Sequence, residues 1–418
     1  MIRTTRTHRV AALGLVAGLA LSACGGGGFD DDTSDPGSQS SADGKADLKV
    51  LIASSGDAET AAVEAAAKKW ADKTGNKVTV TVASDINQEL AQGFASGSPA
   101  DVFYMDAGRF PDYAKNGSLY PYAQDLADGD DFYPALRDTF TYDGEFYCAP
   151  KDFSTLALEI NTASWADAGL TDADIPTTWD QLGTVAGKLT TGDQVGLGIS
   201  TGIDRLGAFV VQDGGWWLND DATAATGSDP AVLDALGYVQ QNLKQGDFAF
   251  ASQLDAGWGG EAFGTGKAAM TIEGNWIKGA MSKDYPDVDY KTVELPEGPA
   301  GKGTLLFTQC WGIAADSPAQ SQAVDLVTAL TAVDQQLEFA DAFGVMPSRQ
   351  SAAVDYEAKF PEDAAFIAGG TYGRGPISAP GMTQVIDDLN AKLESLDSAD
   401  LASVMKSFDT NAGSVLGQ

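Results

Sequence analysis

Between residues 47 and 105 the chain alternates short apolar strands with amphipathic helices, and this alternation restricts the possible fold most strongly. In the predicted helix 59–74, small apolar residues and Trp70 share one face, and Gly75 is well placed to end the helix. Strands are predicted at 47–54, 77–82 and 101–105, and a second helix is predicted at 87–94. Strands that alternate with helices imply the α/β class with a mainly parallel sheet.

The same alternation recurs further along the chain. Asp229 and Pro230 begin a predicted helix with an apolar face, and Gly246 ends it. Strand-like segments lie on both sides of this helix, at 195–199, 268–272 and 304–308. Further helices are predicted at 323–343 and 383–396. We therefore expect a second α/β lobe.

The N-terminal residues have the features of an export signal. Three arginines precede an uncharged run at 10–23, which is shorter than the about 20 residues that a membrane-spanning helix needs. The run ends in LSAC, which resembles the lipobox of bacterial lipoproteins, in which the cysteine (here Cys24) is acylated. We expect residues 1–23 to be a lipoprotein signal peptide and the Gly, Ser and Asp-rich residues 24–45 to be a flexible tether. The alternative is an ordinary secretion signal that happens to end in cysteine.

Composition excludes several classes of function. The chain has 59 acidic and 26 basic residues, a net charge of −33, and one histidine, His8, which lies in the predicted signal peptide. A mature chain without histidine has neither a Ser-His-Asp or Cys-His catalyst nor a zinc site with histidine ligands. The lack of a lysine or arginine run argues against nucleic acid as a partner. No motif of a common cofactor enzyme is evident, and we predict no catalytic residue, no cofactor and no metal.

Two cysteines remain beyond Cys24. Cys148 and Cys310 both lie in segments that resemble buried strands. Export would place them in an oxidising compartment, where a disulfide can persist. We expect a bridge between them, and two inert buried thiols are the alternative.

Five of the eight tryptophans lie within two residues of a glycine: Trp216, Trp217, Trp258, Trp276 and Trp311. Glycine leaves room for a ligand to approach, and an indole offers a flat apolar face with one N–H donor. A pyranose ring, whose C–H faces are surrounded by hydroxyl groups, suits such platforms when carboxylates and amides are nearby. Packing in a core explains any single one of these tryptophans equally well, but we expect several to line one cleft.

The run EAFGTGKAAMTIEGNW at 261–276 closely resembles the F-x-x-G-K-A-A-M-x-x-x-G-x-W signature of extracellular solute-binding proteins, family 1, the maltose-binding class. Weaker matches to the same family follow in the right order over essentially the whole chain after the signal peptide, at 99–122, 149–161, 176–182, 213–217 and 311–327.

The resemblance implies a two-lobed periplasmic-binding-protein fold of class II type, in which each lobe is a mainly parallel sheet flanked by helices. It places the N-terminal lobe at 46–151 and 310–345, and the C-terminal lobe at 152–308 and 346–418. Hinge crossings between the lobes are expected near 151–154, 308–311 and 343–349. The two cysteines would then lie close to the hinge, which makes their pairing geometrically reasonable.

The resemblance also implies a function and partners. Such a protein closes its lobes on a sugar or oligosaccharide and delivers it to the permease of an ATP-binding-cassette (ABC) transporter. We expect an extracytoplasmic monomer that is not an enzyme. Only the lipid on Cys24 would attach it to the cell membrane. The late aromatic residue of the maltose-binding members has no counterpart around Gly381, so the sugar stays unnamed.

Ligand-binding candidates follow position by position from the resemblance. Trp276 matches the aromatic residue that stacks on sugar in the family, and it is the strongest candidate. Tyr104 and Asp106 match a strand end where an aromatic ring and a carboxylate face the cleft. The other candidates lie in the loop after the first strand, at the first crossing, beside Trp276, at the remaining glycine-flanked tryptophans and in a late glycine-rich loop: Asp57, Glu59, Lys151, Asp152, Trp216, Trp217, Trp258, Glu273, Asn275, Trp311 and Arg374.

Several alternatives stay open. Glu59 would equally complement a helix dipole, Lys151 and Asp152 would equally form a hinge ion pair, and one of the two adjacent tryptophans belongs to a core. Two competing functions are a secreted glycosidase that uses paired carboxylates from Asp106, Asp152 and Glu273, and the same fold binding a cationic solute that is not a sugar.

Overall fold

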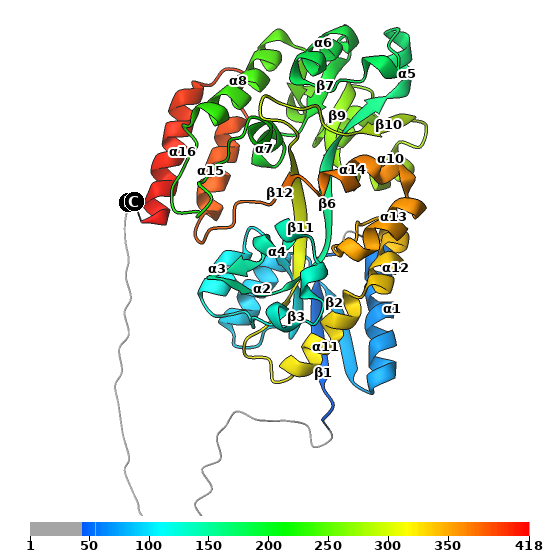
Figure 1. The fold of residues 1–418 in the computed structure, drawn as a ribbon, viewed down its shortest axis with the longest axis vertical. Helices are drawn as coiled ribbons and strands as arrows, with labels where there is room; N and C mark the ends of the chain where they lie inside the picture. The colour runs from blue at the N-terminus through cyan, green and yellow to red at the C-terminus, as the bar shows by residue number, and fades with distance from the viewer. Residues whose placement is uncertain (1–43, 55, 418) are drawn as a thin grey trace, which may run out of the picture. The chain divides into compact units, whose positions relative to one another are not determined.

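The structure is a computed structural model that describes residues 44–54 and 56–417. The predicted signal peptide, Cys24 and most of the predicted tether lie outside the described residues. Ten strands of the described chain form one mixed sheet, and β4 (Thr141–Tyr142) and β5 (Glu145–Phe146) form a separate pair. Across the sheet the order is β2-β1-β3-β11-β6-β9-β7-β8, with β10 on β6 and β12 on β11 (Figure 1).

The strands of the large sheet are β1 (Asp47–Ile52), β2 (Lys77–Val82), β3 (Val102–Asp106), β6 (Ala149–Asn161), β7 (Val195–Ile199), β8 (Phe248–Phe250), β9 (Ala268–Gly274), β10 (Tyr290–Val293), β11 (Thr304–Ile313) and β12 (Gly373–Arg374). At one end β1 pairs in parallel with β2 and β3, and at the other end β7 pairs in parallel with β8 and β9. Between these parallel parts, β11 pairs antiparallel with β3 and β6, and β6 pairs antiparallel with β9. Two parallel regions are therefore joined through a long antiparallel centre.

The helices are α1 (Asp57–Thr74), α2 (Ile86–Ala95), α3 (Phe110–Lys115), α4 (Pro134–Thr139), α5 (Thr162–Asp167), α6 (Trp179–Leu189), α7 (Ile203–Gln212), α8 (Pro230–Gln245), α9 (Gly259–Gly264), α10 (Ile277–Asp284), α11 (Gln320–Leu330), α12 (Val333–Phe343), α13 (Ala353–Lys359), α14 (Ala364–Gly369), α15 (Thr383–Leu393) and α16 (Leu401–Leu416). Gly75 and Gly246 end α1 and α8 in the left-handed conformation that glycine adopts easily, with φ of 75° and 82°, as the sequence predicted. The predicted helix 323–343 is two helices, because the chain turns between Leu330 and Val333.

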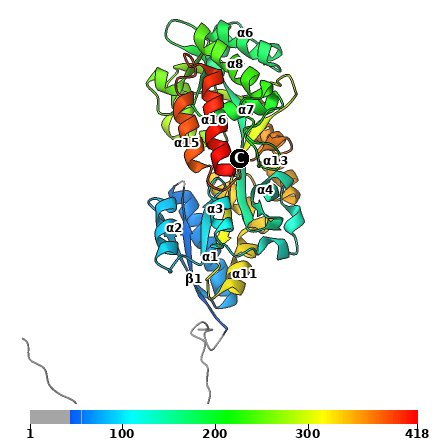
Figure 2. The same cartoon turned by 90° about the vertical axis from the view of Figure 1, so that its left-hand side faces the viewer.

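Two large hydrophobic cores lie along the sheet. One, the N-terminal core, is built from β1, β3, α1 and α11 and includes Trp70 and Trp311. The other, the C-terminal core, is built from β7, α6, α7 and α8, together with α15 and α16, which lie side by side in Figure 2. A smaller cluster around Phe153, Leu306 and Phe366 fills the space near the middle of β6 and β11. Within the described residues, no helix is both long enough and apolar enough to cross a membrane.

A disulfide joins Cys148 and Cys310, whose Cα atoms are 5.7 Å apart. Both cysteines are buried in the N-terminal core, and Cys310 pairs across the ladder with Pro150 of β6. The structure thus contains the bridge that was expected from the sequence. It fixes β11 against the start of β6.

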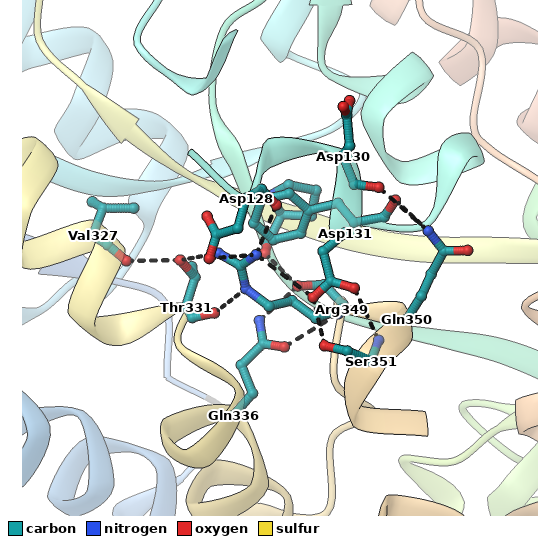
Figure 3. A network of polar contacts seen from close by, with 12 residues as sticks. Asp128, Asp130, Asp131, Val327, Thr331, Gln336, Arg349, Gln350 and Ser351 are labelled. Atoms are coloured by element: carbon teal, nitrogen blue, oxygen red, sulfur yellow. Dashed lines mark hydrogen bonds and ion pairs between the residues drawn. The ribbon is translucent and has the colours of Figure 1, made fainter. Parts of the chain in front are cut away.

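The buried Arg349 fixes the segment after α12 to the N-terminal core side of the molecule (Figure 3). Its Nε donates to the carbonyl of Thr331, and its Nη1 donates to the carbonyl of Asp128 at 3.0 Å. Nη1 also lies 3.0 Å from a carboxylate oxygen of Asp128 and 3.8 Å from one of Asp131. The guanidinium stacks over Phe132 at 4.3 Å. Arg349 therefore connects the loop at 128–132 with the end of α11.

Replacing Arg349 by methionine keeps most of the side-chain volume but removes the donors for two backbone carbonyls. Because each unsatisfied buried polar group costs about 1–3 kcal/mol, we expect Arg349→Met to lower the free energy of unfolding by about 2–4 kcal/mol in urea titrations. Lys68→Met is the control, since Lys68 and Asp72 form an exposed ion pair, with 73% and 67% of their side chains accessible. Equal small effects of both substitutions would contradict this account of Arg349.

Candidate functional site

A cleft of about 860 Å³ lies over the first half of β6 and of β11. Its floor is formed by residues 151–154 of β6 and 305–309 of β11, and its walls come from both ends of the sheet. The wall residues from the N-terminal part follow β1 and β3, and those from the C-terminal part lie at the start of α7, after β9 and along α10. The cleft is therefore placed where the strands pass from one core to the other.

The structure brings together more than half of the predicted ligand-binding residues. Those that line the cleft are Glu59, Asp106, Lys151, Asp152, Trp216, Asn275, Trp276 and Arg374. Asn275 also ties three segments together, because its side chain donates to the carbonyl of Gly344 at 2.7 Å and its backbone N–H donates to Ser154 at 3.1 Å.

Four predicted aromatic residues do not line the cleft. Trp217 packs in the C-terminal core against Phe408, and Trp311 packs in the N-terminal core. Tyr104 is buried edge-on against Trp311, with ring centroids 4.7 Å apart. Trp258 packs near Phe263 on a separate small cluster. Trp216 therefore reaches the cleft, while its neighbour Trp217 is fully buried in the core.

Two predicted carboxylates also lie away from the cleft surface. Asp57 is exposed in the first turn of α1, where it complements the helix dipole. Glu273 is completely buried behind Trp276 and forms an ion pair with Arg205 at 2.6 Å. Neither carboxylate forms part of the cleft lining in the described chain.

A buried charged cluster forms the floor of the cleft on the side of the N-terminal core. Lys151 lies 3.2 Å from Glu59, forms a second ion pair with Asp152 and stacks on the ring of Tyr104 at 4.6 Å. Burial by itself lowers the pKa of Lys151, but the two carboxylates outweigh it and raise the pKa. Burial and the neighbouring Glu59 raise the pKa of Tyr104 well above its usual range, so its hydroxyl donates to Glu59 at 2.9 Å.

Aromatic rings form the opposite wall. Trp276 keeps 38% of its surface exposed, and its ring packs at right angles to Phe307 at 5.0 Å. Trp216 is half-buried, and the guanidinium of Arg374 stacks over it at 4.7 Å. Arg374 also lies 3.7 Å from Asp220, an exposed residue. Two indole surfaces therefore line one cleft together with charged groups.

Sequence reasoning missed several lining residues. Phe307, Phe343, Asp204 and Lys278 all reach the cleft. The alternation of β11 gave no signal for Phe307, because its neighbours Leu305 and Leu306 also line the cleft. The positions of Asp204 and Lys278 depend on how α7 and α10 pack, for which the sequence has no local signal.

Comparison with known proteins decides the family. Residues 65–368, more than half of the chain, match the family described as bacterial extracellular solute-binding protein. The chain belongs to this family. The membership that the run 261–276 predicted is confirmed.

Relatives and solved structures agree with this assignment. The solute-binding protein is 27% identical over 396 residues to the diacetylchitobiose binding protein DasA of Streptomyces coelicolor, covering 88% of each chain. Its fold is similar to that of the ABC substrate-binding protein Lmo0181 from Listeria monocytogenes in complex with cycloalternan, with a TM-score of 0.78 and 21% identity over 89% of this chain and 99% of that one. The fold is also similar to that of the cyclic alpha-maltosyl-1,6-maltose binding protein from Arthrobacter globiformis, with a TM-score of 0.79 and the same identity and coverage. The predicted two-lobed α/β fold is confirmed.

A second buried carboxylate of this solute-binding protein lies in the sheet near Glu273. Glu159 of β6 stands between Thr271 of β9 and Thr292 of β10, and it accepts a hydrogen bond from Thr292 at 2.7 Å. Burial raises the pKa of Glu159 to about 8; Thr292 opposes this, and the nearby Asp363 adds to it. Glu159 is therefore protonated in the fold at pH 7.

Replacing Glu159 by glutamine tests this protonation. The pKa of Glu159 is raised from 4.5 to about 8 by folding, so the stability that it contributes is present below pH 4.5 and is lost as the pH rises towards 8. We expect the wild type to lose up to several kcal/mol of stability relative to Glu159→Gln over this window, at about 1.4 kcal/mol for each pKa unit. Urea unfolding of both proteins at several pH values measures the difference. A stability difference between the two proteins that does not change with pH would contradict the raised pKa of Glu159.

Proposed function

We propose that this protein is the substrate-binding component of an ABC importer and that its cleft binds a sugar or oligosaccharide. The observation that carries the proposal is the half-exposed indole of Trp276 in a cleft that also presents Asp106 and Asp152. An aromatic face packs against the C–H side of a sugar ring, and carboxylates accept hydrogen bonds from its hydroxyl groups. The relatives whose names specify a ligand support the choice of carbohydrate.

Two lobes that close on the ligand would explain why the cleft lies over β6 and β11. We propose lobes of 46–151 with 310–351 and of 152–308 with the residues after 351. For the third crossing we place the boundary after Ser351 rather than near 343–349, because Arg349 binds Thr331 and Asp128. Closure would then bring the walls of the cleft onto the ligand, and the closed monomer would dock on its permease.

Binding without hydrolysis is the chemistry that the cleft supports. Of the three carboxylates considered for a glycosidase, Glu273 is buried behind Trp276, and Asp152 is held by Lys151. Asp106 is exposed at the cleft. Incubation with oligosaccharides should therefore release no reducing sugar, while binding shifts the thermal unfolding temperature.

The ligand is tested with a saccharide panel that includes diacetylchitobiose and maltodextrins, read by thermal shift and tryptophan fluorescence. For a saccharide that binds, we expect Trp276→Ala to weaken binding at least about tenfold, because a large buried aromatic contact is lost. Trp258→Ala is the matched control, since it removes an equally large ring that lies outside the cleft lining. If no saccharide binds the wild type, or if both variants bind equally well, the carbohydrate site as proposed is wrong.

We propose that the chain is anchored outside the cytoplasm through a lipid on Cys24, which lies outside the described residues. The sequence LSAC before the glycine-rich tether supports this. Mass spectrometry of the exported protein should show an N-terminal peptide that begins at Cys24 and carries acyl chains. An exported protein whose Cys24 is unmodified would exclude the anchor.

A further inference from the structure

The indole of Trp276 is held from behind by a buried carboxylate. Its Nε1 donates to Oε2 of Glu273 at 3.0 Å, and Glu273 has no exposed surface. The same oxygen accepts a hydrogen bond from Nη2 of Arg205 at 2.6 Å. Because hydrogen bonds to a charged group are stronger than neutral ones, the N–H edge of the indole has one preferred partner.

Glu273 is itself fixed by segments that are distant in the sequence. Ser200, which follows β7, donates to Oε1 of Glu273 at 3.3 Å and accepts from the backbone N–H of Gly259 at 2.9 Å. A Cβ atom on Gly259 would lie 2.7 Å from Oε1, so the start of α9 closes against the carboxylate. The carboxylate therefore has a single position, set by β7, α7, α9 and β9.

Arg205 holds the ring as well as the carboxylate. Its guanidinium carbon lies 5.2 Å from the ring of Trp276 and 5.6 Å from the ring of Phe307. Only 12% of its side chain is exposed. A cation over an aromatic face is attracted to it, so the guanidinium supports one side of the indole.

The position of the indole also requires a glycine in the backbone beneath the ring. A Cβ atom on Gly274 would lie 2.2 Å from Cζ3 of Trp276. The ring thus folds back over the end of β9, and only glycine leaves space for it there.

We propose that Glu273 and Arg205 are positioning residues, which hold the indole of Trp276 in the orientation that the ligand meets before the ligand binds. The proposal rests on the proposed function of the cleft. A ring that is ordered in advance loses less conformational freedom when the ligand binds, so the pair contributes to affinity without touching the ligand. A purely structural ion pair, by contrast, would not determine the hydrogen bond of the indole.

The indole N–H resonances of the ligand-free full chain, labelled with ¹⁵N, test the orientation. The chain has eight tryptophans, and Trp276→Phe identifies the resonance of Trp276. In Glu273→Gln we expect this resonance to move upfield by more than any other indole resonance, because a charged acceptor is replaced by a neutral one. Gly274→Ala should move it too, because its Cβ atom would displace the ring. If Glu273→Gln does not fold, Arg205→Met decides the matter, because it removes the guanidinium that shares Oε2 of Glu273 with the indole.

Glu294→Gln is the matched control, since Glu294 forms an ion pair with Lys302 at 2.7 Å away from the cleft lining. It should leave the resonance of Trp276 in place. A resonance that stays in place in Glu273→Gln, or in Arg205→Met where only that variant folds, would overturn the proposal.

Affinity for diacetylchitobiose, measured by calorimetry, separates this proposal from the proposed function. If the wild type binds, Glu273→Gln and Gly274→Ala should each weaken binding about tenfold, Arg205→Lys should retain more affinity than Arg205→Met, and Glu294→Gln should change nothing. Unchanged affinity in Glu273→Gln and Gly274→Ala would overturn the positioning role. If the wild type binds no saccharide of the panel, the carbohydrate function fails, and the resonances alone decide whether Glu273 and Arg205 position the ring.

Discussion

The antiparallel pairing of β6 with β11 connects the two hydrophobic cores, and the positions of the cleft residues depend on it. The register of this pair shifts between Gln309 and Cys310, beside the disulfide that joins Cys310 to Cys148. Beyond the bridge, both strands run out of the N-terminal core and form the floor of the cleft. A change in this register would move the side chains of the floor to the other face of the sheet.

Charges around the cleft are handled in two ways. On the floor, Lys151 lies between Glu59 and Asp152, so the cost of burying an ammonium group is offset by two carboxylates. In the wall, Glu273 and Arg205 neutralise each other behind the ring of Trp276. What the cleft presents to a ligand is therefore a set of fixed polar groups beside aromatic surfaces, even though the whole chain carries a net charge of −33.

The sequence predicts the local elements well because their signals are local. Apolar periodicity and a terminal glycine located α1 and α8 to within about two residues. The antiparallel centre could not be predicted in this way, because the pairing of β11 with β3 and β6 joins residues far apart in the chain. The tryptophans show the same limit. A nearby glycine does not distinguish Trp276, which faces the cleft, from Trp311, whose strand position turns it into a core.

A crystal structure of the protein with the saccharide that gives the largest thermal shift would show directly where the sugar binds. We expect one sugar ring stacked on the indole of Trp276, over the floor formed by β6 and β11, with hydroxyl groups within hydrogen-bond distance of Asp106 or Asp152. A saccharide bound elsewhere on the protein, or bound in the cleft with Trp276 turned away from it, would contradict the proposed binding site.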